Sequence, residues 1–107
     1  MMVLDNQVSV SGQLIIDDLP ALAAEGVEIL VCNRPDKESP DQTDFHIIEA
    51  EAKKQGLQVE NIPFAGGQLQ PEHVSAFVDL MDTGKRIHAY CRTGNRCTQL
   101  WNVAKQV

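Results

Sequence analysis

The sequence lacks the features that would place a protein in a membrane or on a nucleic acid. No apolar run among its 107 residues approaches the roughly 20 needed to cross a bilayer, and the first residues lack the pattern of a signal peptide. Lysine and arginine form no block, and the formal net charge is −6. This charge argues against nucleic acid or an anionic membrane as the main partner.

Cysteine is also scarce. The chain has three cysteines, an odd number, which favours a reducing compartment over a disulfide framework and makes cytoplasm the expected location. Internal repeats, low-complexity tracts and linkers are missing as well. We therefore expect residues 1–107 to form one domain, long enough for a real hydrophobic core.

What the sequence does contain is a regular alternation of strand and helix patterns. Apolar runs predict strands at 8–10, 27–32, 57–64 and 86–90, and amphipathic stretches predict helices at 19–26, 44–56, 71–84 and 98–107. Four β-α units with short connections imply an α/β fold of three layers, with a mainly parallel central sheet flanked by helices. In such sheets the site lies beyond the carboxyl ends of the strands, which here means loops 33–42, 65–70 and 91–96.

The last of these loops, Cys91–Arg96, reads Cys-Arg-Thr-Gly-Asn-Arg between a strand and a helix. A cysteine that faces a helix N-terminus lies where N–H groups and the helix dipole favour an anion. We expect Cys91 to ionise well below its usual pKa of about 8.5 and to act as a nucleophile. The alternative is a buried structural cysteine followed by an ordinary turn.

Arg96 is the second residue of the predicted site. Its planar fork suits two oxygens of an oxyanion, although it could also be a surface arginine on the first helical turn. Gly94 is predicted to adopt a positive φ and to turn N–H groups inward. The candidate anion-binding residues around Cys91 and Arg96 are Arg92, Thr93, Gly94, Asn95 and Arg34; of these, Thr93 and Asn95 fit a scaffolding role better.

Several other residues have two interpretations. Asp36 and Asp41 are candidate general acids, but loop aspartates commonly form turns or caps. Cys97 is a packed residue at a helix start, a hydrogen-bond donor to the thiolate, or a resolving thiol. His88 is a buried, satisfied imidazole or a group that tunes the loop. No histidine has a ligand partner at metal-binding spacing, so we predict neither a metal site nor a cofactor.

Six short motifs of this sequence together resemble those of a known family. The motifs are Val10-Ser11-Gly12-Gln13-Leu14, Asn33-Arg34-Pro35-Asp36, Ile62-Pro63, Gly66-Gly67, Tyr90–Arg96 and Leu100-Trp101. The whole chain is similar to the bacterial beta-lactamase hydrolase-like phosphatase-like domain. The resemblance implies a small dual-specificity (tyrosine) phosphatase fold of the cysteine phosphatase superfamily, with Cys91 as nucleophile and Arg96 as anion-binding residue. Members of that family occur alone or fused to metallo-β-lactamase-type domains that resemble persulfide dioxygenases. The resemblance thus implies a link to sulfide metabolism and a partner of that type.

Two departures from true phosphatases affect the expected chemistry. Those enzymes have five residues between nucleophile and arginine, whereas this chain has four, as in the single-sulfur cradle of rhodaneses. The stretch Phe64–Gln68, where phosphatases usually carry the acid for the leaving group, contains no carboxylate. An acid contributes about 10²–10⁴-fold to such reactions.

The sequence therefore favours a thiol-dependent sulfurtransferase acting on a small anion, either thiosulfate or a low-molecular-weight persulfide. Two alternatives stay open. One is a tyrosine or dual-specificity phosphatase that hydrolyses a phosphoester, and the other is a non-catalytic module that binds an anion or senses sulfide.

Overall fold

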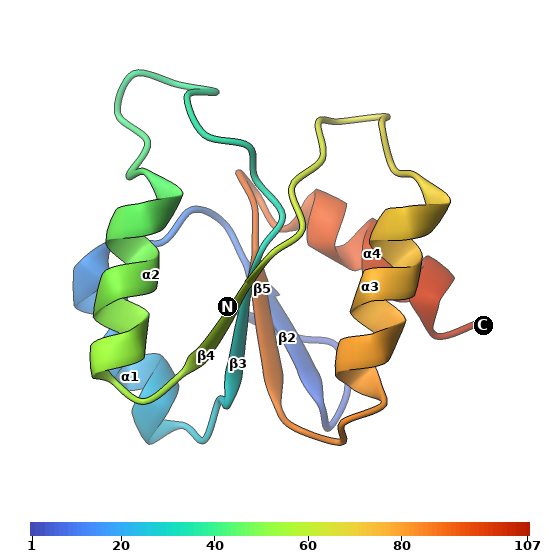
Figure 1. Cartoon of the computed structure of the whole chain (residues 1–107), viewed down its shortest axis with the longest axis horizontal. Helices are drawn as coiled ribbons and strands as arrows, with labels where there is room; N and C mark the ends of the chain where they lie inside the picture. The colour runs from blue at the N-terminus through green and yellow to red at the C-terminus, as the bar shows by residue number, and fades with distance from the viewer.

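A five-stranded sheet lies at the centre of the computed structural model, which describes residues 1–107 (Figure 1). Its strands are β1 (Met2–Val3), β2 (Val8–Ser11), β3 (Ile29–Cys32), β4 (Gln58–Asn61) and β5 (Ile87–Tyr90). They lie in the order β1-β2-β5-β3-β4, with β1 antiparallel to β2 and every other pair parallel. The predicted, mainly parallel sheet is therefore confirmed, with one short antiparallel edge strand in addition.

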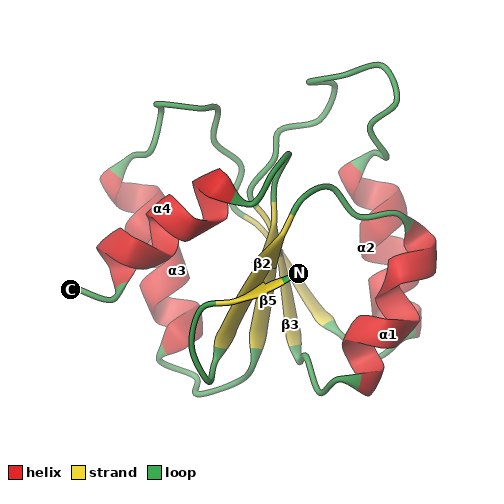
Figure 2. Ribbon diagram, turned by 180° about the vertical axis from the view of Figure 1, so that it is seen from behind, coloured by secondary structure: helices red, strands yellow, loops and turns green.

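Four helices cover the two faces of this sheet. They are α1 (Leu19–Ala24, after a 3₁₀ turn at Ile16–Asp18), α2 (Phe45–Lys54), α3 (Pro71–Met81) and α4 (Asn95–Ala104). Helices α1 and α2 lie on one face, and α3 and α4 lie on the other (Figures 1 and 2). This arrangement confirms the three layers. None of the helices is both long and apolar enough to span a bilayer.

The central strands are apolar on both faces because each face packs against helices. In β3, Ile29 and Val31 join the core under α3 and α4, while Leu30 and Cys32 join the core under α1 and α2. Alternation along a strand sends neighbouring side chains to opposite faces, so a continuous apolar run serves both cores. Cys91 continues the alternation of β5 and belongs to the core under α3 and α4.

The register of the sheet brings the ends of four strands level. Ser11 pairs with Tyr90, Tyr90 with Cys32, and Cys32 with Asn61, and each is the last residue of its strand. The loops that follow these strands therefore all leave the sheet at the carboxyl ends of the parallel strands. The sequence analysis expected the site at these strand ends.

Most element boundaries differ from the sequence-based prediction by one to three residues, and two of the differences lie next to the site. Strand β4 covers only Gln58–Asn61, although Leu57, Ile62 and Phe64 beyond its ends are buried as the predicted strand required. Helix α4 begins at Asn95, three residues earlier than predicted, because Gly94 takes a left-handed conformation (φ 96°) that ends the loop there. Arg96 consequently lies in the first turn of α4.

Candidate active site

Cys91 follows directly after β5, at the point where the chain turns toward α4. The residue is buried, 1% exposed, and its Sγ accepts a hydrogen bond from the Gly94 N–H at 3.0 Å. Gly94 can direct this N–H inward because its φ of 96°, which was predicted to be positive, is readily accessible to glycine. The sulfur is thus packed into the core, yet the neighbouring main chain turns a donor toward it.

The electrostatic surroundings lower the pKa of Cys91 to about 5. The largest cause is the side chain of Cys97, followed by burial, which acts in the opposite direction, and then by the backbone N–H groups of Cys97, Thr93 and Gly94. Cys97 itself is buried, and burial beside Cys91 raises its pKa, so it remains a neutral thiol able to donate a hydrogen bond. Cys91 is therefore a thiolate at neutral pH.

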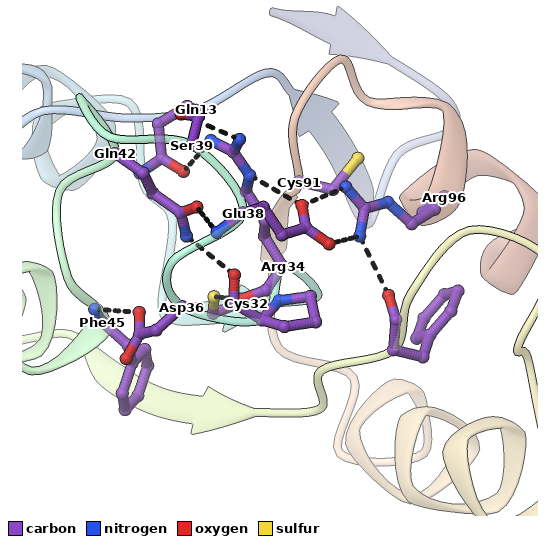
Figure 3. Close-up of polar contacts among 12 residues, drawn as sticks. Gln13, Cys32, Arg34, Asp36, Glu38, Ser39, Gln42, Phe45, Cys91 and Arg96 are labelled. Carbon is purple, nitrogen blue, oxygen red and sulfur yellow. Dashed lines mark hydrogen bonds and ion pairs between the residues drawn. The ribbon is translucent and has the colours of Figure 1, made fainter.

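Arg96 lies at the meeting point of three loops. Its Nη1 and Nη2 atoms each donate to Glu38 at 2.8 Å, and Nη1 also donates to the Phe64 carbonyl oxygen at 3.0 Å (Figure 3). These bonds use the outer end of the guanidinium. The Nε–H and the second Nη2 hydrogen form no bond in the protein, and together they make a free fork that suits an oxyanion.

Glu38 joins Arg96 to Arg34. Its Oε1 accepts from Arg34 Nε at 2.9 Å as well as from Arg96 Nη2 at 2.8 Å, and these arginines hold its pKa below the ordinary value. Arg96, in return, has its pKa raised by Glu38. Glu38 is thus an anion that fixes the orientation of Arg96.

Arg34, a candidate anion-binding residue, is held inside the protein. It is 4% exposed, and its other donors bind Gln13 Oε1 at 3.0 Å and Ser39 Oγ at 3.4 Å. Each of the three guanidinium nitrogens of Arg34 makes a hydrogen bond within the protein, and Glu38 links Arg34 to Arg96. The placement of Arg34 supports the loop rather than contacting an anion.

Apart from Gly94, which is buried, the residues between Cys91 and Arg96 are exposed to solvent. Arg92, Thr93 and Asn95 are exposed, and the Arg92 side chain forms no hydrogen bond or ion pair. Thr93 Oγ1 accepts the Asn95 N–H at 3.3 Å, which fits the scaffolding role considered for both residues. The loop therefore offers its backbone to the sulfur and leaves the Arg92 side chain in solvent.

The two candidate general acids are engaged elsewhere. Asp36 Oδ1 accepts the Phe45 N–H at 2.8 Å and so caps the start of α2 (Figure 3). Asp41 is exposed, accepts the Ser39 hydroxyl at 2.7 Å, and has its pKa lowered chiefly by that bond. Asp36 acts as a cap and Asp41 makes a contact within its loop, as in the alternative interpretation. Nowhere do three or more His, Cys, Asp or Glu side chains gather as metal ligands.

Sequence reasoning gave no role in the site to Glu38 or to the segment Ser11–Gln13, which it noted only as part of a motif. The Ser11 carbonyl accepts the Cys91 N–H at 3.3 Å, and the Gln13 N–H donates to the Arg92 carbonyl at 3.4 Å. A Cβ on Gly12 would lie 2.8 Å from that Arg92 oxygen, so only glycine fits. The available signals were an acidic residue four positions after Arg34 and a glycine directly after a strand.

Comparison with known proteins identifies a family and solved structures that this chain is similar to. The family described as beta-lactamase hydrolase-like protein, phosphatase-like domain, matches residues 1–107. A crystal structure of a candidate phosphatase from Neisseria meningitidis is 33% identical, with a TM-score of 0.85 over 94% of this chain and 72% of that one. Tk-PTP in its active form shares the fold at 20% identity, with a TM-score of 0.67 over 86% of this chain and 61% of its own. The fold is that of the cysteine phosphatases.

Curated relatives are considerably longer. The beta-lactamase hydrolase-like protein of Agrobacterium fabrum is 27% identical over 99 residues, which are 92% of this chain and 23% of the relative. The protein of the same name from Xylella fastidiosa is 24% identical over 105 residues, which are 97% of this chain and 24% of the relative. The chain therefore spans about a quarter of the length of the curated relatives it matches.

Proposed function

The chain belongs to the beta-lactamase hydrolase-like phosphatase-like domain family, and on that basis we propose that it is a sulfurtransferase that uses Cys91 as its nucleophile. One observation carries the proposal. The Cys91 thiolate is held in a loop with only four residues before Arg96, and no carboxylic acid is placed to protonate a leaving group.

The absence of a placed acid matters because the two chemistries have different leaving groups. An alkoxide released from a phosphate ester needs a proton, whereas sulfite leaves as a stable anion. Asp36 caps α2, Asp41 is exposed, and Glu38 is held ionised by two arginines. The surroundings of Cys91 therefore support a reaction whose leaving group departs without general acid catalysis.

In the proposed reaction the Cys91 thiolate attacks the outer sulfur of thiosulfate. The Cys91 Sγ–S bond forms as the S–S bond of thiosulfate breaks, and sulfite leaves with the bonding electron pair. The product is a cysteine persulfide anion, stabilised by the N–H groups of the loop. Attack of cyanide or a thiolate on its outer sulfur then regenerates the Cys91 thiolate and gives thiocyanate or a new persulfide.

Arg96 positions the donor in this scheme. Its Nε–H and free Nη2 hydrogen can bind two sulfonate oxygens, while Glu38 fixes the opposite end of the guanidinium. A low-molecular-weight persulfide with a carboxylate would use the same fork. We also propose a partner for this chain, a metallo-β-lactamase-type dioxygenase domain that oxidises the product persulfide.

The test follows the transferred sulfur. The protein is incubated with thiosulfate and its intact mass measured, and thiocyanate is then measured after addition of cyanide. We expect a one-sulfur adduct that is absent from Cys91→Ser, and strongly reduced turnover in Arg96→Lys, since lysine cannot present two fixed donors. A parent protein that forms neither adduct nor thiocyanate would overturn the proposal.

A phosphatase is the second candidate, favoured by the fold and by the description of the Neisseria meningitidis relative as a candidate phosphatase. Here Cys91 would attack phosphorus and form a phosphocysteine. An aryl phosphate is the suitable substrate, because its phenolate leaves with less need of an acid. Turnover of this substrate that disappears in Cys91→Ser would favour phosphoryl transfer, and inactivity toward both substrates with retained anion binding would indicate a binding module.

A further inference from the structure

A buried polar group joins the adjacent strands β2 and β5, two residues before the end of β5. His88 in β5 is fully buried and lies between two serines of the adjacent strand β2. Its Nδ1 is 2.7 Å from Ser9 Oγ and its Nε2 is 2.8 Å from Ser11 Oγ. A polar group at this depth in an otherwise apolar sheet must be fully hydrogen-bonded to be tolerated.

The direction of each hydrogen bond follows from one proton. The Ser11 hydroxyl also lies 2.9 Å from the Gly12 carbonyl oxygen, which can only accept, so the hydroxyl proton belongs there. Ser11 Oγ must then accept from His88 Nε2–H, and the unprotonated Nδ1 accepts from the Ser9 hydroxyl. Burial lowers the pKa of His88 to about 4, which keeps the imidazole in this neutral form.

The hydrogen bonds continue through two peptide planes to the nucleophile loop. In a trans peptide the C=O and the following N–H point in opposite directions. Because the Gly12 carbonyl faces Ser11 Oγ, the Gln13 N–H faces the other way and donates to the Arg92 carbonyl at 3.4 Å. That carbonyl in turn directs the Thr93 N–H away from Gln13, toward the side of the loop where the next N–H, that of Gly94, donates to Cys91 Sγ at 3.0 Å. Both N–H groups lower the pKa of Cys91.

We propose that Ser11, held by the buried imidazole of His88, is a positioning residue for Cys91. It fixes the Gly12–Gln13 peptide, and this peptide holds the Arg92–Thr93 peptide with its N–H toward the sulfur. The close approach of Gly12 to the Arg92 oxygen adds a steric limit to the same arrangement. The inference rests on the proposed role of Cys91 as nucleophile, but it concerns the thiolate itself and holds for either sulfur or phosphoryl transfer.

The decisive comparison is between Ser11→Ala and Ser9→Ala. Both remove one hydrogen bond from His88, but only Ser11→Ala releases the Gly12 carbonyl. The thiolate is titrated by its ultraviolet absorbance, as the difference between each variant and the same variant carrying Cys91→Ser. We expect Ser11→Ala to raise the pKa of Cys91 by about one unit, roughly a fivefold loss of thiolate at pH 5, because one donor to an ionised group is misdirected.

Ser9→Ala is the matched control, and we expect it to lower the melting temperature without moving the titration. Ser11→Thr, which keeps the hydroxyl, should restore the parent titration. Gly12→Ala leaves the serines and His88 intact but displaces the Arg92 carbonyl, and it should raise the pKa of Cys91 as Ser11→Ala does.

Parent-like titrations in both Ser11→Ala and Gly12→Ala would overturn the positioning role and leave Ser11 and His88 as core structure only. An equal rise in Ser9→Ala and Ser11→Ala would also overturn it, because the effect would then follow lost stability. If Cys91 of the parent protein does not ionise below neutral pH, the proposed function itself fails.

Discussion

The contact between Cys97 and Cys91 gives the sharpest prediction. Cys97 is the largest cause of the lowered Cys91 pKa, and its own thiol stays protonated because it is buried. Cys97→Ala removes the donor, whereas Cys97→Ser replaces the thiol with a hydroxyl that can still donate. Both variants remove the sulfur from the core, so their comparison separates hydrogen bonding from packing.

The expected magnitude follows from the strength of one hydrogen bond to an ionised group. Such a bond contributes about 1.5–3 kcal/mol, which corresponds to about one to two pKa units. Cys97→Ala should therefore raise the pKa of Cys91 from about 5 to between about 6 and 7. At about pH 6 the thiolate fraction would fall roughly two- to tenfold, while well above pH 8 it would match that of the parent.

The assay is the pH dependence of Cys91 alkylation by iodoacetamide, located by mass spectrometry because the chain has three cysteines. The alkylation curve of Cys97→Ala should shift to higher pH, and that of Cys97→Ser should stay near the parent curve. If Cys97→Ala alkylates like the parent throughout, Cys97 does not stabilise the thiolate. If both variants shift equally, the shift results from loosened packing.

Three further predictions concern stability and two acidic residues of the loop after β3, Asp36 and Glu38. The pKa of Cys91 is lower in the folded protein than in the unfolded chain, so the unfolded chain binds more protons between the two values. The free energy of unfolding should therefore rise with pH from about 5 to about 9 and lose this slope in Cys91→Ser, as measured by urea titration. Asp36→Ala should destabilise the protein by about 0.5–2 kcal/mol through loss of the α2 cap, yet keep parent turnover; a selective loss of turnover would restore Asp36 as a general acid. Glu38→Gln should lower kcat/KM for thiosulfate at least about tenfold, because Arg96 loses its fixed orientation, and an unchanged KM and kcat would show that Arg96 needs no anchor.

The fold could be predicted from the sequence because its signals are local. Apolar runs such as Val27–Cys32 suit strands buried on both faces, and Pro71 marks the first residue of α3, as predicted. Helix α4 was placed three residues too late. That error has a local cause, because the first turn, Asn95–Thr98, has Cys97 as its only apolar residue and so carries little periodic signal.

The candidate site, like the fold, could be predicted from the sequence only where the signals are local. Cys91 and Arg96 could be identified as a pair because a short loop between strand and helix fixes their surroundings within six residues. The roles of Asp36 and Arg34 could not be predicted, since a loop carboxylate reads alike as an acid or a cap until its partner is known. Their partners are the Phe45 N–H and Glu38.

By itself the sequence determined the alternation of elements, the carboxyl ends of the strands as the place of the candidate site, and the pairing of Cys91 with Arg96 in one short loop. Only the tertiary structure decided that Glu38 fixes Arg96 from 58 positions away and that β2 lies beside β5, which brings Ser11 and Gly12 against the nucleophile loop. The physical reason is that strand order and register bring distant residues together, whereas hydrophobic periodicity specifies only which face of each element is buried.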